Sequence, residues 1–407
     1  MAAIISIVLP VYNTQDCIEA CIDSLLCQTF SDFELICVDD GSTDATPGIL
    51  DRYAAADGRV KVLHRTNAGP GAARNAGLDE ARGSYIIFLD SDDIFDAHML
   101  EKLHARASQT GADVVVCRSR TFDHRTGAFA RTNWTVNEAQ LPPGDTFCCA
   151  DMPDFIFSAF VGWPWDKFYR LAFVREEGLR FPTLANSEDL YFVFLSLVKA
   201  RSISIVEDVL IDHRVNRGSS VSNSRAKEPL QFYESICLLK GELQKDPQTY
   251  DRVSWGFLNW AMSYLLWNTE NMTDPEGRRV MLDALAADGF PELEIDRHCP
   301  AFFSLDPSLY GRYTELMREA VGCAETPDLN DRHPRLSYVV AFFQNAQAKG
   351  FRHAFGELFR WAKRKTVGGD PAPDMFSSAR RGFDLPLLGS NARERFARIE
   401  ANGGEPR

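Results

Sequence analysis

The chain has 407 residues, of which 45% are hydrophobic, and its 57 acidic and 44 basic residues give a formal net charge of −13. This length allows two domains, or one domain with an extension, and the acidic balance excludes a general nucleic-acid binder. No apolar run reaches the ~18 residues of a membrane span, and no basic region precedes the first apolar segment, so we expect neither a span nor a signal peptide. The ten cysteines include no C-x-x-C pair, and we expect them to be reduced core residues of a cytoplasmic protein.

Predicted strands and helices alternate through about the first 93 residues. Apolar, β-prone runs predict four strands, and the segments between them carry helix signals such as the periodicity of Ile18, Cys21, Ile22 and Leu25. The strands are expected at 4–9, 33–38, 60–63 and 84–89. This alternation predicts a doubly wound, mainly parallel α/β sheet, whose ligand binds beyond the carboxyl ends of the strands.

The acidic sequence Asp90-Ser91-Asp92-Asp93 follows the last of these strands. Three carboxylates in one turn repel one another and are costly unless a cation neutralises them. A D-x-D pair at the end of a strand can bind Mg²⁺ or Mn²⁺, and the remaining positions of the metal can hold a diphosphate. A solvated acidic turn is the alternative interpretation.

Five motifs in this region resemble those of the family 2 glycosyltransferases, which have the GT-A fold. In chain order they are Val8–Asn13, Val38–Ser42, Asn67-Ala68-Gly69, Ala73–Gly77 and Leu89–Asp93. The resemblance continues more weakly to about residue 222, through Gly162–Lys167, Leu179-Arg180-Phe181 and Glu188–Phe192, which are similar to the acceptor half of bacterial polysaccharide members.

This resemblance implies the transfer of a sugar, usually with inversion, from a nucleoside diphosphate sugar to a saccharide or lipid-linked saccharide. It also implies a role for each matching residue. Pro10, Tyr12 and Asp40 lie where the family holds the nucleobase, typically uracil, with Asp39 as a neighbour that could share the role; Arg74 lies near the phosphates and ribose, Asp90 near the ribose or metal, Asp92 at the metal, and Asp189 at the general base.

The chemistry of the reaction also requires a general base, independently of the family resemblance. A sugar hydroxyl is a poor nucleophile until a carboxylate takes its proton. In a single displacement that carboxylate lies across the anomeric carbon from the leaving group, so we expect it on a different segment from the metal site. The pair Glu188-Asp189 meets this condition. The alternative is a helix cap, in which Asn186 or Ser187 begins a helix and the two acids only favour its dipole.

Other candidates follow from residue type. Trp163 and Trp165 are candidates for stacking on an acceptor sugar, with core packing as the alternative. Lys167 marks the acceptor side or is a surface lysine. His213 is a further candidate metal ligand, and a surface or core histidine is the alternative.

We expect a GT-A domain over residues 1–222, divided into a nucleotide-binding half (1–93) and an acceptor half (94–222). A mainly helical extension over 223–367 and a loosely ordered tail over 368–407 would follow. Within the extension, basic and aromatic residues mix in the segment 349–365. That mixture predicts contact with the cytoplasmic face of a membrane, or a basic helix docked on the acidic body.

Two other functional classes deserve comparison. A nicotinamide-dependent oxidoreductase is excluded, because the sequence from Gly69 to Arg74 ends in arginine where the dinucleotide fingerprint needs glycine, and it follows the third strand. A non-catalytic nucleotide-sugar-binding or scaffold protein would be favoured if Asp92 or Asp189 were missing, and both are present.

Overall fold

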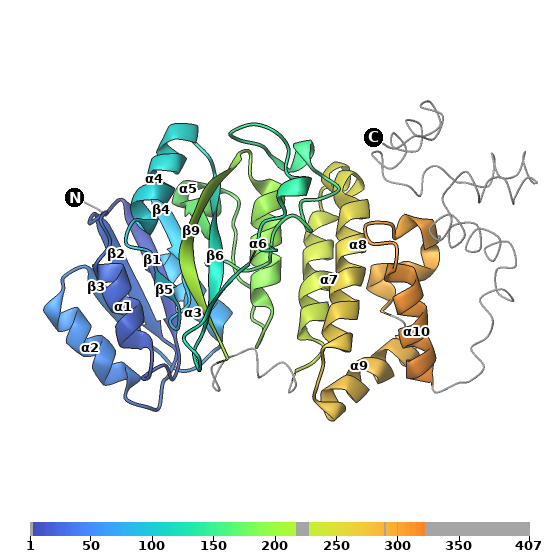
Figure 1. Ribbon diagram of the computed structural model, residues 1–407, viewed down its shortest axis with the longest axis horizontal. Helices are drawn as coiled ribbons and strands as arrows, with labels where there is room; N and C mark the ends of the chain where they lie inside the picture. The colour runs from blue at the N-terminus through green and yellow to red at the C-terminus, as the bar shows by residue number, and fades with distance from the viewer. Residues whose placement is uncertain (1–2, 133, 217–227, 289, 299, 322–407) are drawn as a thin grey trace, which may run out of the picture. The chain divides into compact units, whose positions relative to one another are not determined.

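The computed structural model describes residues 3–132, 134–216, 228–288, 290–298 and 300–321 (Figure 1). The chain divides into two compact units, Met1–Lys245 and Asp246–Arg407. The first unit therefore extends beyond the boundary expected at residue 222 and includes helix α7 (Gln231–Leu243). The basic segment 349–365 and the tail 368–407 lie outside the described residues, so the statements about them stay predictions.

The first unit is built on one sheet, to which the described residues contribute nine strands in the order β3-β2-β1-β4-β8-β6-β9-β5, with β7 paired to β6. The strands are β1 (Ile5–Val11), β2 (Phe33–Asp39), β3 (Val60–His64), β4 (Tyr85–Phe88), β5 (Ile94–Phe95), β6 (Val114–Asp123), β7 (Phe129–Arg131), β8 (Lys167–Arg170) and β9 (Ile203–Val215).

The four strands predicted from the sequence form the parallel half of this sheet, because β1 pairs in parallel with β2 and β4, and β2 pairs in parallel with β3. Strand β8 is reversed: it runs antiparallel to β4 on one side and to β6 on the other. Its first residue, Lys167, therefore lies at the edge where the parallel strands end. That edge gathers segments from both halves of the unit.

Helices cover both faces of the sheet, which explains why its central strands are apolar on both sides. Helices α1 (Ile18–Leu26), α2 (Thr46–Ala56) and α4 (Met99–Thr110) contribute to the core cluster on one face. Helices α3 (Pro70–Glu80) and α6 (Glu188–Lys199) lie on the other; a short helix, α5 (Leu171–Glu176), follows β8.

Strand β4 shows how this arrangement directs the residues that follow a strand toward one face of the sheet. Successive strand residues point to opposite faces. Ile87 and Leu89 belong to the core cluster with α1 and α4, whereas the ring of Phe88 packs edge-on against Phe192 of α6 at 5.3 Å. Asp90, two residues after Phe88, is consequently directed toward the face that α3 and α6 cover.

The second unit is helical in its described part, with α8 (Pro247–Glu270), α9 (Pro275–Asp288) and α10 (Leu309–Val321). Asp246 caps α8 by accepting a hydrogen bond from the backbone N–H of Gln248. One face of α8 is apolar and buried, formed by Trp255, Leu258, Met262, Leu265 and Leu266. None of the helices in the described ranges is long and apolar enough to cross a membrane.

Helix α3 approaches β1 so closely that Gly77 has no room for a side chain, since a Cβ atom there would overlap the side chain of Val8. We predict that Gly77→Ala lowers the free energy of unfolding by about 1–3 kcal/mol, the usual cost of overpacking. Gly48→Ala in α2 is the matched control, because nothing in the described chain lies within 4 Å of its added methyl group, and it should leave stability unchanged or raise it by about 1 kcal/mol. Denaturant unfolding measures both, and equal effects would contradict this packing.

Candidate active site

The ends of β1 and β2 bring together the residues expected at the nucleobase. Asp40 is buried and accepts hydrogen bonds from the backbone N–H groups of Ala68 (3.1 Å) and Gly69 (2.8 Å) in the glycine-rich turn. Asp39 accepts from the N–H of Ser42 at 3.0 Å and contacts Nδ1 of His64 at 2.7 Å. These two carboxylates therefore fix the loops around the end of β2.

Beside them, the ring of Tyr12 follows β1 and is 49% exposed. Pro10, within β1, is partly buried and pairs in register with Val38 of β2. The fixed loops and the open aromatic ring give this edge the components of a site for a planar base.

Arg74 connects three segments that are distant in sequence. Its guanidinium donates one hydrogen bond to Asp90, after β4, at 2.9 Å, and another to Glu188, at the start of α6. The side chains of Arg74 and Glu188 are both buried. Burial alone would lower the pKa of Arg74, but Asp90, Glu188 and Asp189 outweigh it and raise the pKa. The three acids therefore hold Arg74 charged, and Arg74 fixes their positions.

Gly71 allows α3 to lie close to the segment that precedes α6. A Cβ atom at Gly71, in the first turn of α3, would lie 2.7 Å from the carbonyl oxygen of Pro182 and 3.0 Å from Cγ of Glu188. Any larger residue would push α3 away from the segment that precedes α6. The Gly-rich turn identified in the sequence thus serves close helix packing here.

The start of α6 follows the helix-cap interpretation only in part: Ser187 is the N-cap residue and Glu188 and Asp189 lie in the first turn, but the capping hydrogen bond is absent. Ser187, at the N-cap position, has a left-handed backbone (φ 61°) and makes no capping hydrogen bond with its side chain. Its hydroxyl instead donates to Oδ1 of Asn186 at 3.0 Å. A left-handed residue other than glycine is a sparsely populated conformation. It delivers Glu188 and Asp189 to different surroundings, because Glu188 is buried against Arg74 while Asp189 is partly exposed.

The acidic turn after β4 contains one carboxylate that the sequence did not single out. Asp93 is fully buried, contacts Nδ1 of His213 at 3.1 Å and accepts from the N–H of Arg214 at 2.8 Å. Burial raises the pKa of Asp93 to about 6, although the contact with His213 opposes that rise. Burial would lower the pKa of His213, but the carboxylate outweighs it and raises the pKa to about 9. The pair is therefore ionic at neutral pH.

The described residues contain no group of three or more histidine, cysteine or acidic side chains that could hold a metal ion unaided. Mg²⁺ needs no such cage, since it commonly binds through one or two carboxylates together with substrate phosphates. Asp90, which is 28% exposed, and the partly exposed Asp92 fit that mode, whereas Asp93 is engaged elsewhere. His213 fits only as a supplementary ligand: Asp93 holds its Nδ1 and orients the ring, so Nε2 could bind a cation only after that nitrogen loses its proton.

The three acceptor candidates occupy different environments. Trp163 is partly exposed, whereas Trp165 is buried and stacks on the ring of His213 at 5.0 Å. Lys167 is fully buried, so it is not a surface lysine. Its ammonium donates to Asp166 and to the carbonyl oxygens of Val161 and Trp163, at 2.5, 2.9 and 2.9 Å. A lysine enclosed in this way positions the loop that contains Val161 and Trp163 and does not reach an acceptor itself. Trp165, which is also buried, supports the ring of Trp163.

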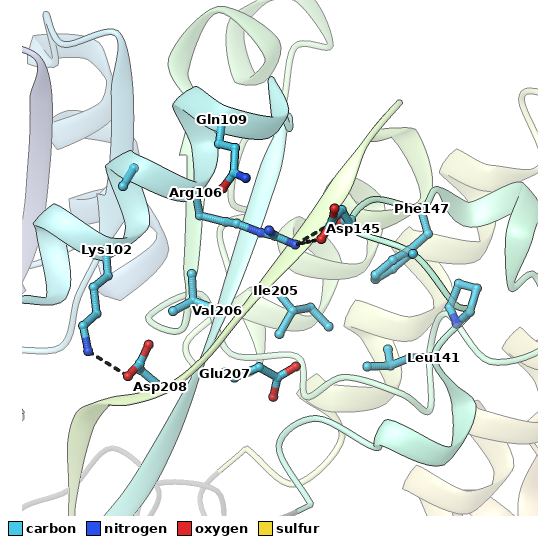
Figure 2. Close-up of a pocket in the computed structure, with 13 residues that line it drawn as sticks. Lys102, Arg106, Gln109, Leu141, Asp145, Phe147, Ile205, Val206, Glu207 and Asp208 are labelled. Atoms are coloured by element: carbon cyan, nitrogen blue, oxygen red, sulfur yellow. Dashed lines mark hydrogen bonds and ion pairs between the residues drawn. The ribbon is translucent and has the colours of Figure 1, made fainter.

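A pocket of about 620 Å³ lies apart from all these residues, between α4, β9 and the segment 141–147 (Figure 2). Its charged side chains pair with one another: Lys102 donates to Asp208 at 2.7 Å, and Arg106 donates to Asp145 at 3.1 Å. None of the candidate residues lines it. We therefore place the candidate site at the carboxyl edge of the sheet, where the titratable groups converge.

Comparisons with known proteins agree with this fold. The model of glycosyl transferase family 2 matches residues 6–162. A putative glycosyltransferase, EpsH of Bacillus subtilis, is 35% identical over 238 residues, which span 57% of this chain and 67% of EpsH. A poly(ribitol-phosphate) beta-glucosyltransferase of Bacillus spizizenii is 32% identical over 240 residues, spanning 57% of this chain and 35% of that protein.

The fold also matches the crystal structure of Staphylococcus aureus TarS 1–349 in complex with UDP-GlcNAc. The TM-score is 0.60 at 23% sequence identity, over 78% of this chain and 90% of that one. Sheet, helical extension and carboxylate-lined edge together define a glycosyltransferase of the GT-A fold. The chain belongs to glycosyl transferase family 2.

Because Arg74 and Glu188 are buried together, removing one charge leaves the other unpaired. We predict that Arg74→Met lowers the free energy of unfolding by about 3–5 kcal/mol, and that adding Glu188→Met recovers much of this loss. Arg180→Met is the control, since the pair of Arg180 with Asp79 is more than half exposed and should contribute at most about 1 kcal/mol. Chemical denaturation of all four variants, including Glu188→Met alone, decides; strictly additive losses would contradict the coupling.

Proposed function

We propose that this glycosyltransferase transfers a sugar from a uridine diphosphate sugar to a hydroxyl group of a saccharide or lipid-linked saccharide acceptor, in polysaccharide synthesis. The observation that carries the proposal is the link through Arg74, which ties Asp90 of the acidic turn to the start of α6, where Asp189 lies. Two groups that a single displacement requires, a diphosphate-binding acidic turn and a base from another segment, are thereby held at one edge.

The donor's nucleobase would lie on the exposed ring of Tyr12, next to Pro10 and Asp40. Uracil has a single ring N–H, and a buried carboxylate such as Asp40 is a suitable acceptor for it. The choice of uridine is supported by the likeness to TarS, whose structure was determined with UDP-GlcNAc. The name of the Bacillus spizizenii relative supports a polymer as the acceptor.

The leaving diphosphate would lie beyond the acidic turn. A Mg²⁺ or Mn²⁺ ion held by Asp92 and Asp90 would supply the positive charge that the departing diphosphate needs. His213 would be a supplementary ligand, once the cation displaces the proton from its ring. The side chain of Arg74 is occupied by Asp90 and Glu188. Its part in donor binding would therefore be indirect, through the orientation of Asp90.

The reaction itself is a single displacement. Asp189 takes the proton of the acceptor hydroxyl as that oxygen forms a bond to the anomeric carbon, and the bond between this carbon and the diphosphate oxygen breaks on the opposite side. The anomeric configuration is therefore inverted. We assign the base to Asp189 and not to Glu188, because the carboxylate of Glu188 is buried and paired with Arg74, whereas Asp189 is partly exposed and can be reached by an acceptor hydroxyl.

Asp92 provides the first test. We predict that Asp92→Asn removes the enhancement of UDP binding by Mn²⁺ while the protein stays folded, since it withdraws one charged ligand from the cation. Asp96→Asn, a nearby exposed carboxylate, should keep the enhancement. Isothermal titration calorimetry with UDP, with and without Mn²⁺, measures both. Enhancement that survives in Asp92→Asn would remove Asp92 from the metal site.

Asp189 provides the second test. We predict that Asp189→Asn keeps the affinity for the donor and lowers turnover by on the order of 10²–10⁴, the usual contribution of a general base, because the amide cannot accept the hydroxyl proton. Asp79→Asn, on the exposed side of α3, is the control of equal charge change. Release of UDP from a panel of uridine diphosphate sugars with saccharide acceptors measures turnover. A loss below tenfold would move the base to another carboxylate.

A further inference from the structure

Trp134 is a tryptophan that is 55% exposed. Described residues near it in sequence make hydrogen bonds to neighbouring segments: the hydroxyl of Thr132 donates to the carbonyl of Ser119 at 2.6 Å, and the N–H of Asn137 donates to the carbonyl of Ala159 at 2.9 Å. A large aromatic ring in contact with water is expected where it meets a ligand.

This ring continues an aromatic series that begins at the acidic turn. Trp134 packs edge-on against Trp163, with centroids 5.2 Å apart and planes at 75°. Trp163 stacks on Trp165 at 5.1 Å, and Trp165 stacks on His213 at 5.0 Å. His213 in turn contacts Asp93. Trp134 is thus the outermost member of a continuous series that leads away from the reaction centre.

We propose that Trp163 and Trp134 form two successive stacking positions for the acceptor, and that the acceptor is therefore an oligosaccharide of at least two units. The inference rests on the proposed function. A pyranose ring with equatorial hydroxyls has an apolar C–H face that packs on an aromatic ring, while its hydroxyl rim stays in water. Because the two indoles are nearly perpendicular, one sugar ring cannot lie flat on both, so each takes a different unit of the chain.

The strand order assigns this surface to the acceptor and not to the donor. The donor residues Tyr12 and Asp40 follow β1 and β2, on one side of β4, whereas Trp163 precedes β8 and Trp134 follows β7, which pairs with β6 on the other side of β4. The acidic turn after β4 separates the two. A phosphate group next to this turn would meet its carboxylates, so we expect the unit of the acceptor that stacks on Trp163 to be a neutral sugar.

The test measures binding of β-linked gluco- and N-acetylgluco-oligosaccharides, from the monosaccharide upward, to the full chain with UDP present. We expect affinity for the wild type to rise from the monosaccharide to longer members. Trp134→Ala should weaken the longer members by roughly two- to tenfold, the magnitude of one aromatic contact, and leave the monosaccharide unaffected. Trp134→Phe should retain most of the gain, because it keeps an aromatic face.

Trp267→Ala is the matched control, since Trp267 is 48% exposed and belongs to the second unit; it should behave as the wild type. The proposal is overturned if Trp134→Ala binds every length as the wild type does, or if the wild type with UDP bound gains nothing from longer chains. UDP binding, followed in the same titrations, keeps the two proposals separate. If UDP itself does not bind, the proposed function fails; if UDP binds and the length dependence is absent, only the stacking positions fail.

Discussion

The site depends on the placement of one buried guanidinium. Asp39, Asp40, Asp90, Asp92, Asp93, Glu188 and Asp189 are carried to one edge of a sheet in a protein of net charge −13, and such groups repel one another. Arg74 is buried among three of them and bonds two. A buried ion pair adds little net stability compared with apolar packing, but losing one partner is costly. Its main effect is therefore geometric: it allows one relative placement of α3, the acidic turn and α6.

Two other cations act in the same manner. Lys167, enclosed without exposure, binds Asp166 and the carbonyl oxygens of the Trp163 loop. His213 binds Asp93 and supports Trp165. In each case a positive side chain turned away from water pairs with polar groups of a loop at the candidate site. The loops at this edge are thus held by charges from within the fold, and Tyr12, Asp92 and Asp189 keep exposed surface beside them, as the proposed function requires.

The sequence alone was enough to predict the parallel half of the fold, because β1 to β4 are apolar runs separated by clear helix and turn signals. It also indicated the acidic turn, because three carboxylates follow an apolar run there, and Glu188-Asp189, because that pair matches a motif of the family on a segment separate from the turn. It could not show that Glu188 pairs with Arg74 across 114 positions, because no local pattern encodes such a contact. For the same reason it could not show that Lys167, expected on the acceptor side or at the surface, is fully buried. Trp134 was missed because one tryptophan among polar residues has no periodicity to reveal its partner Trp163.

The reversed strand β8 has a consequence for how the chain folds. β8 lies between β4 and β6, so strands β1 to β4 form a sheet whose β4 edge stays unpaired until residues 167–170 arrive. Unpaired edges of apolar strands recruit other chains, and contacts between distant segments form slowly. During synthesis, strands β1 to β4 are therefore all present before β4 has its second hydrogen-bonding partner. Pairing of β8 with β4 also places Lys167 against the carbonyl oxygens of Val161 and Trp163, so the step that covers the exposed strand edge also fixes the loop that carries Trp163.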